Sequence, residues 1–207
     1  MIDGWARARI DPFVRKVAAL LLPTGVAANT VSWAGLAIGL SAAFAIALGA
    51  YVAGLALLLA SRLADALDGE IARARGKTDF GGFLDLTLDF AFYGAIPLGF
   101  AVADPRFALP AAALIAAFYV NGASFLGFAL LAEKRGLTTD LRGDKSIYFT
   151  GGLAEAGETL IVFSLMCLAP AWFPVLAWGF AAICLLTALM RISAAQRAFA
   201  PHSGNGG

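Results

Sequence analysis

The chain alternates long apolar stretches with short polar breaks along almost all of its 207 residues. Each stretch is about twenty residues long, which is the length that a helix needs to cross the hydrocarbon core of a bilayer. The pattern predicts six transmembrane helices, at about 30–49, 52–74, 80–101, 107–131, 147–168 and 172–192. They form one bundle over 30–192, and we expect the whole chain, 1–207, to be a single domain.

Residues 3–22 have a different pattern, because apolar residues recur on one face of a helix and charged residues fall largely on the other. The apolar set is Ile10, Phe13, Val14, Val17 and Leu21, and the opposite set is Arg7, Asp11, Arg15 and Ala18. Such a pattern is typical of an amphipathic helix that lies in the membrane interface. Asn29 or Thr30 can then cap the first span. The predicted fold is therefore all-α, a polytopic membrane protein with six transmembrane helices and an N-terminal interfacial helix.

Composition and charge agree with this prediction. Hydrophobic residues make up 60% of the chain, the mean hydropathy is +0.81 and only 14% of residues are charged, which excludes an ordinary soluble domain. All fifteen lysines and arginines except Arg62 and Arg106 lie in the N-terminal helix, in 73–79, in 133–146 or from Arg191 onward. The positive-inside rule then predicts that both termini are cytoplasmic, in a bacterial-type inner membrane. Cys167 and Cys184 lie in separate apolar stretches, and we expect them to be buried and unpaired.

Four aspartates interrupt the second and third spans. Asp65 and Asp68 are three residues apart, Asp85 and Asp89 are four apart, and each pair shares a helix face. The short polar turn between the spans makes them antiparallel, so the four side chains can converge at similar depth. A carboxylate inside a membrane is costly and marks a functional site. Oxygen ligands without cysteine or histidine favour magnesium, manganese or calcium, and two such ions would neutralise the cluster.

The residues around the aspartates suggest what a metal ion would hold. Gly69 and Ala72 leave one helix face bare, and Arg73 can donate to phosphate oxygens, with Arg75, Lys77 and Thr78 nearby. Metal, arginine and accessible backbone together are typical of phosphoryl transfer. The alternative is a set of structural Asp–Arg ion pairs, which four regularly spaced carboxylates with two glycines make improbable.

The string Asp65-x2-Asp68-Gly69-x2-Ala72-Arg73-x7-Gly81-x3-Asp85-x3-Asp89 resembles the signature of the CDP-alcohol phosphotransferases at all eight positions. The six expected spans, the preceding amphipathic helix and the Asn29-Thr30 start of the first span are also similar to that family. The resemblance implies an enzyme of phospholipid synthesis that moves a phosphatidyl group from CDP-diacylglycerol to the hydroxyl of an alcohol and releases CMP. The resemblance also permits a homodimer, and it implies no nucleic-acid partner.

Carried over by position, the resemblance implies that Asp65, Asp68 and Asp85 ligate two Mg²⁺ or Mn²⁺ ions. Asp89 completes the second metal site and is the expected general base on the acceptor hydroxyl. The CDP group would be bound by the remaining signature residues and one neighbour, namely Asp68, Gly69, Ala72, Arg73, Thr78 and Gly81.

The signature does not identify the acceptor alcohol. Arg142 and Lys145 resemble a basic turn that holds an acceptor phosphate, although positive-inside bias and lipid headgroups explain them equally well. Glu155 and Glu158 share a helix face and either pair with Arg62 or bind the acceptor. We expect glycerol 3-phosphate or another polyol first, and then inositol phosphate, an amino alcohol or phosphatidylglycerol. A small carboxylate-dependent transporter is the competing class, which the glycines and arginine in register with the aspartates disfavour.

Overall fold

The computed structural model describes residues 2–136 and 156–199, and within these ranges every regular element is a helix. The elements are α1 (Ile2–Leu21), η1 (Leu22–Thr24), α2 (Ala28–Ala47), α3 (Tyr51–Arg75), α4 (Asp79–Ala103), η2 (Pro105–Phe107), α5 (Ala108–Lys134), α7 (Ala156–Leu168), η4 (Pro170–Trp172) and α8 (Phe173–Phe199). The expected helices at 3–22, 52–74 and 80–101 agree with α1, α3 and α4 to within two residues.

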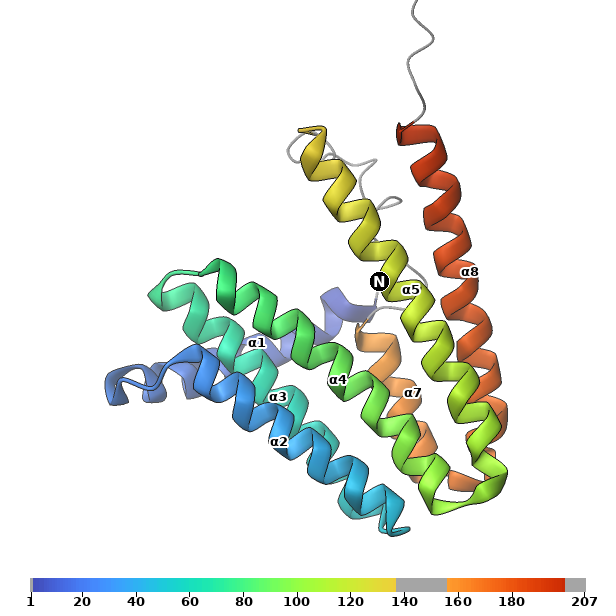
Figure 1. Ribbon diagram of the computed structural model, residues 1–207. Coiled ribbons are helices and arrows are strands. Elements are labelled where there is room, and N and C mark those ends of the chain that lie inside the picture. Colours follow the sequence, from blue (N-terminus) through green and yellow to red (C-terminus); the bar gives the residue numbers. More distant parts are fainter. Residues whose placement is uncertain (1, 137–155, 200–207) are drawn as a thin grey trace, which may run out of the picture.

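The helices form two groups that lie on either side of α7 (Figure 1). Helix α2 packs against both α3 and α4, and α5 and α8 form the second group. Helix α1 runs behind the first group and contacts α3 and α7. The chain therefore places the two aspartate-bearing helices, α3 and α4, beside α2.

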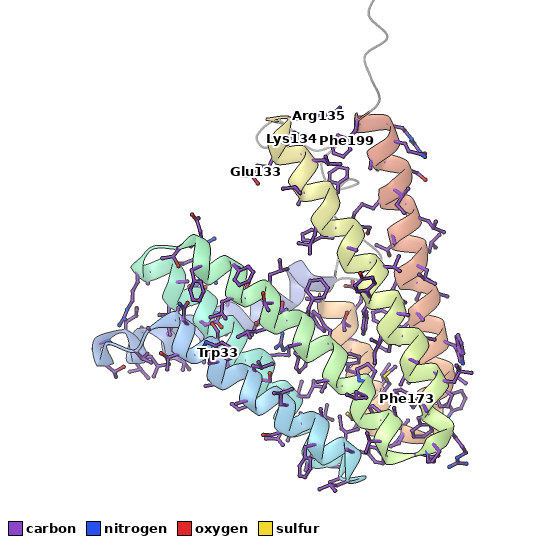
Figure 2. All side chains as sticks on the ribbon, viewed as in Figure 1. Trp33, Glu133, Lys134, Arg135, Phe173 and Phe199 are labelled. Carbon is purple, nitrogen blue, oxygen red and sulfur yellow. The ribbon has the colours of Figure 1, made fainter. Side chains whose placement is uncertain are left out.

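Aromatic rings close the end of the bundle where η2 and η4 lie. Phe100 stacks on Phe173 with 4.4 Å between ring centroids, and both side chains are fully buried. Tyr51 stacks on Phe100 at 5.6 Å and Phe107 lies 5.0 Å from Phe173, so four helical segments meet here. Figure 2 shows Phe173 at this end and Arg135 with Phe199 at the opposite end of α5 and α8. This cluster fixes the two groups of helices relative to each other.

Close approach sets the register of α2 against its neighbours. A Cβ atom at Gly39 would lie 2.6 Å from Phe92 Cδ2, so only glycine lets α4 come this near. On the other side, Ser61 Oγ donates a hydrogen bond of 2.8 Å to the carbonyl oxygen of Gly35. These contacts lie about one helical turn from Asp65 and Asp89 along α3 and α4, and they hold both aspartates beside α2.

The turn between α3 and α4 is well defined. Gly76 ends α3 with φ of +98°, a backbone conformation that favours glycine. Thr78 caps α4, because its hydroxyl accepts a 3.0 Å hydrogen bond from the Gly81 amide. Arg75 donates to the carbonyl oxygens of Leu22 and Gly25 at 2.8 and 2.9 Å. The end of α3 is thereby tied to the segment that joins α1 to α2.

Two expectations about the N-terminal part need correction. Ala18, expected on the polar face of the first helix, is buried together with Val14 one turn earlier, because α1 packs on α3 and α7 through this side. Phe13 and Leu20 are exposed instead. The cap of α2 is Ala27 without a side-chain hydrogen bond, so neither Asn29 nor Thr30 has the expected capping role.

Four helical stretches of the described chain are long and apolar enough to cross a membrane, at Ala28–Ala47, Asp79–Ala103, Pro105–Lys134 and Pro170–Phe199. Helix α3 does not qualify by composition, because its second half carries six charged residues, Arg62, Asp65, Asp68, Glu70, Arg73 and Arg75. Helix α7 is shorter, and the first part of the expected 147–168 span lies outside the described residues. Cys167 and Cys184 are buried and free, as predicted.

Candidate metal centre and adjoining cleft

Three of the four predicted carboxylates come together between α3 and α4. One carboxylate oxygen from each of Asp65, Asp68 and Asp85 lies within 4.8 Å of the others. Asp68 is buried, with 6% of its surface exposed, while Asp65 is partly buried and Asp85 is exposed. Three hard oxygen donors from two neighbouring helices fit a divalent ion such as Mg²⁺ or Mn²⁺. No cysteine or histidine among the described residues joins this group.

Asp89 lies beside this group and not within it. Its Oδ1 accepts a hydrogen bond of 2.6 Å from Nη1 of Arg62, a residue of α3. Arg62 and the four aspartates line one small cavity of about 10 Å³, with Ser32, Gly35, Leu36 and Leu88. This is room for about one water-sized sphere. The fourth predicted ligand therefore shares the cavity but has an arginine as its partner.

Of the two alternatives for Glu158, the ion pair with Arg62 of the second span is wrong. Arg62 pairs with Asp89 and lies 3.7 Å from Asp65 Oδ1, and the described residues contain no ion pair between Arg62 and Glu158. Glu158 lies in the first turn of α7, and its Oε2 is buried without a hydrogen-bond partner. The other three acceptor candidates, Arg142, Lys145 and Glu155, lie outside the described residues.

A larger cleft of about 430 Å³ adjoins the small cavity. The two share Ser32, Asp68 and Asp85 as walls. The cleft contains all six residues expected to bind the CDP group, which are Asp68, Gly69, Ala72, Arg73, Thr78 and Gly81. On the first turns of α4, Phe80 and Phe83 expose about 60% of their surface, at 60% and 63%. The metal centre thus opens into a cleft with acidic and basic side chains in its wall, and Phe80 and Phe83 flank Gly81 and Gly82 of that wall in sequence.

The polar groups of the cleft are positioned by other parts of the chain. Arg73 donates a 2.8 Å hydrogen bond to Glu70, whose carboxylate is also 3.8 Å from Arg15 of α1. Thr78 already accepts from the Gly81 amide, so its hydroxyl shapes the start of α4. Arg75 already donates hydrogen bonds to backbone carbonyl oxygens. Within the described part of the chain, the side chains of Arg73 and Lys77 make no such hydrogen bond to the backbone.

Helix α2 contributes Ser32, which the sequence analysis did not name, and Asn29, which it named only as a possible cap and as part of the start of the first span. Asn29 and Ser32 line the cleft, and Asn29 Oδ1 would be 3.5 Å from a Cβ atom at Gly81. They lie one turn apart on α2, on the side that faces α3 and α4. Their only sequence signal is that two polar residues begin an apolar span, which a helix start explains equally well.

Arg191 is a second arginine whose place the sequence did not predict. Its Nη1 donates to the main-chain and side-chain oxygens of Asn121 at 3.1 and 3.0 Å, and to Ser124 Oγ at 2.7 Å. The guanidinium also lies 5.5 Å from the ring of Phe125. These contacts join α8 to α5 at a point between the ends of both helices.

Comparison with known proteins agrees with the geometry. A family model described as CDP-alcohol phosphatidyltransferase matches residues 25–192. The inner membrane protein YnjF of Escherichia coli is 43% identical over 193 residues, which cover 93% of this chain and 94% of that protein. An archaetidylinositol phosphate synthase of Methanothermobacter thermautotrophicus is 40% identical over 94 residues, 45% of each chain.

Solved structures share the fold. The phosphatidylinositol phosphate synthase PgsA1 of Mycobacterium tuberculosis with CDP-DAG bound aligns with a TM-score of 0.70 at 24% identity, covering 88% of this chain and 93% of that one. The same enzyme in complex with manganese and citrate aligns with a TM-score of 0.63 at 25% identity, covering 87% of each chain. The protein described here belongs to the CDP-alcohol phosphatidyltransferase family and is a membrane-embedded transferase.

Proposed function

We propose that this protein transfers a phosphatidyl group from CDP-diacylglycerol to the hydroxyl of a small phosphorylated alcohol and releases CMP. The observation that carries the proposal is the three-carboxylate group of Asp65, Asp68 and Asp85, which opens through shared walls into the cleft beside it. The fold of a synthase crystallised with CDP-DAG supports the donor. A carboxylate-dependent transporter is set aside, because the chain belongs to a transferase family.

The proposal includes two divalent ions, Mg²⁺ or Mn²⁺, held by Asp65, Asp68, Asp85 and Asp89. The oxygen donors of the three-carboxylate group fit a divalent ion, and a relative in fold was solved with manganese. Bound there, the ions supply charge neutralisation for the donor diphosphate and orient it for in-line attack. Asp68 and Asp85 wall both the cavity and the cleft, so they would place the phosphates at the boundary between the two.

In the cleft, we assign the CDP group to the bare face of α3. Gly69 and Ala72 allow a flat ligand to approach the helix, and Arg73 would donate to phosphate oxygens while Glu70 holds it. Thr78 would act through its cap on α4 more than through direct contact, since its hydroxyl bonds to the Gly81 amide.

Gly69→Leu is expected to raise the KM for CDP-diacylglycerol by roughly tenfold or more, the effect of about 1.4 kcal/mol of lost binding. The added side chain would fill the cleft, because a Cβ atom at Gly69 has only the Arg73 guanidinium nitrogens within 4 Å, at 3.7 and 3.9 Å. Steady-state kinetics in mixed micelles measure this change.

Gly179→Leu is the matched control, since Gly179 on α8 has no atom within 4 Å of an added Cβ and lies outside the cleft. Its KM for the donor should equal that of the unmodified protein. An unchanged KM in Gly69→Leu would contradict the donor assignment.

Asp89 is the proposed general base on the acceptor hydroxyl. It shares the small cavity with the three-carboxylate group, and its Oδ1 is held by Arg62, which leaves Oδ2 for the hydroxyl. A base at this place only has to accept the proton as the new P–O bond forms.

For the acceptor we propose a phosphorylated polyol, with inositol phosphate and glycerol 3-phosphate as the two candidates. Two archaeal relatives are archaetidylinositol phosphate synthases, which supports inositol phosphate. Arg142, Lys145, Glu155 and Glu158 remain the proposed acceptor residues. For Glu158 the support is its buried Oε2, a hydrogen-bond acceptor without a partner among the described residues.

The proposed arrangement in the membrane is six spans in a bacterial inner membrane, with both termini and the active site cytoplasmic. The E. coli relative is an inner membrane protein, and the distribution of lysine and arginine favours this orientation. A homodimer is part of the proposal, and the alanine-rich helix faces would permit it.

Purified protein with labelled CDP-diacylglycerol, Mg²⁺ or Mn²⁺ and a panel of acceptors tests the proposal. We expect CMP release that depends on a polyol phosphate and stops in excess chelator. Glu158→Gln should raise the KM for the acceptor and leave that for the donor unchanged. Turnover in excess chelator, or turnover with unphosphorylated alcohols only, would refute the metal or the acceptor proposal respectively.

A further inference from the structure

A carboxylate stands next to the cleft that we assign to the anionic donor. Glu70 follows Gly69 along α3, and its side chain is only 17% exposed. Glu70 does not line the cleft, whereas Gly69 and Arg73 do. A fixed negative charge so near to a diphosphate opposes donor binding, unless other groups neutralise it. The contacts of Glu70 therefore indicate what this residue does.

Arg73 is the first partner of Glu70. Its Nη2 donates a 2.8 Å hydrogen bond to Glu70 Oε1, and the interval of three residues places both side chains on one face of α3. The two terminal guanidinium nitrogens also lie 3.7 and 3.9 Å from the place that a Cβ atom would take at Gly69. The group is thus held over the bare face of the helix. Among the described residues, Nη1 and Nε of Arg73 have no hydrogen-bond acceptor, so they can donate to phosphate oxygens.

The second partner of Glu70 comes from α1. Nε of Arg15 lies 3.8 Å from the same Glu70 oxygen. Val14 and Ala18, on either side of Arg15 along α1, are buried, and α1 packs on α3 and α7. The place of Arg15 therefore depends on how α1 packs on the bundle. Charges alternate in sign from α1 toward the cleft, in the order Arg15, Glu70 and Arg73.

We propose that Glu70 is a positioning residue of the donor site and that Arg15 of α1 assists it. Glu70 holds Arg73 over Gly69, where the guanidinium would meet the donor phosphates. When Arg73 donates to a phosphate, Arg15 still neutralises Glu70, so the carboxylate does not repel the donor. This rests on the proposed function, which places the CDP group in this cleft. Helix α1 thereby takes part in donor binding, although none of its described residues lines the cleft.

Binding of CDP-diacylglycerol to the intact, Mn²⁺-loaded protein tests the role of Glu70, because binding does not require turnover. Glu70→Ala should raise the Kd for the donor by roughly three- to tenfold, within the range of coupling between residues in contact. In an Arg73→Met background, the same substitution should raise the Kd no further. A carboxylate without a positioning role would only repel the anionic donor, and its removal would lower the Kd.

The same measurement tests Arg15. Arg15→Gln should raise the Kd for the donor about two- to fivefold, the effect of an exposed ion pair, and should have no effect in the Glu70→Ala background. Lys16→Gln is the matched control, because Lys16 is the next residue of α1, is exposed and forms no ion pair among the described residues. It removes the same charge and should leave the Kd unchanged in a neutral detergent at the same ionic strength.

The opposite results are equally clear. A Kd that falls or stays unchanged in Glu70→Ala, or that rises equally in both backgrounds, would overturn the role of Glu70. Equal effects of Arg15→Gln and Lys16→Gln would overturn the role of Arg15. Failure of the unmodified protein to bind CDP-diacylglycerol would instead refute the proposed function, and this inference with it. If Glu70→Ala does not fold, Glu70→Gln replaces it, and the Kd should still rise because the amide keeps the shape of the side chain but not its charge.

Discussion

Asp68→Asn is expected to abolish transfer, with kcat below about one-thousandth of the unmodified value. Asp68 is the buried member of the three-carboxylate group and a wall of both cavities. An amide cannot supply the negative charge that a divalent ion needs, and loss of the ion removes several kcal/mol of transition-state stabilisation, roughly 4 kcal/mol for a thousandfold loss. Asp65→Asn and Asp85→Asn should behave in the same way. Turnover and Mn²⁺ binding, measured on the same preparations, check the prediction.

The chain offers a matched control for these variants. Asp104→Asn makes the same change at the opposite end of α4, where Asp104 pairs with Arg106 and caps η2. This variant should keep both its activity and its affinity for Mn²⁺. Near-normal turnover in any one of the three cluster variants would show that the metal assignment is wrong at that position.

Asp89→Asn is expected to lower kcat by about two to four orders of magnitude, the usual contribution of a general base. Binding of CDP-diacylglycerol should change much less, because Asp89 does not line the cleft that we assign to the donor. Single-turnover kinetics together with donor binding to the metal-loaded protein separate the two effects.

The opposite result for donor binding has a clear meaning. If affinity for the donor falls as steeply as kcat, Asp89 serves chiefly as a metal ligand. Asp89→Glu gives a further check, since a carboxylate displaced by one methylene should recover only part of the loss when geometry limits the reaction.

Much of this arrangement could be predicted from the sequence, because it depends on local spacing. The interval of three between Asp65 and Asp68 and the interval of four between Asp85 and Asp89 place each pair on one helix face, and the short turn makes α3 and α4 antiparallel neighbours. These facts suffice to bring Asp65, Asp68 and Asp85 together. The bounds of α3 and α4 followed in the same way from the lengths of the apolar stretches.

The partners across helices could not be predicted, because they depend on register. Whether Arg62 meets Asp89 or Glu158 is decided by how far α4 slides along α3, which the close approach at Gly39 and the Ser61 bond to Gly35 determine. The contribution of Asn29 and Ser32 depends on α2 packing over the cleft. No spacing within one helix contains this information.

Phe80 and Phe83 are exposed and flank Gly81 and Gly82, which line the cleft at the start of α4. We expect the entrance of the cleft, where the charged end of α3 meets the start of α4, to lie at the level of the lipid headgroups. A lipid donor reaches such an entrance by lateral diffusion within the sheet of lipid, and its product leaves in the same two dimensions. The concentration that governs the reaction is therefore the mole fraction of donor in the bilayer, and inert lipid acts as its solvent.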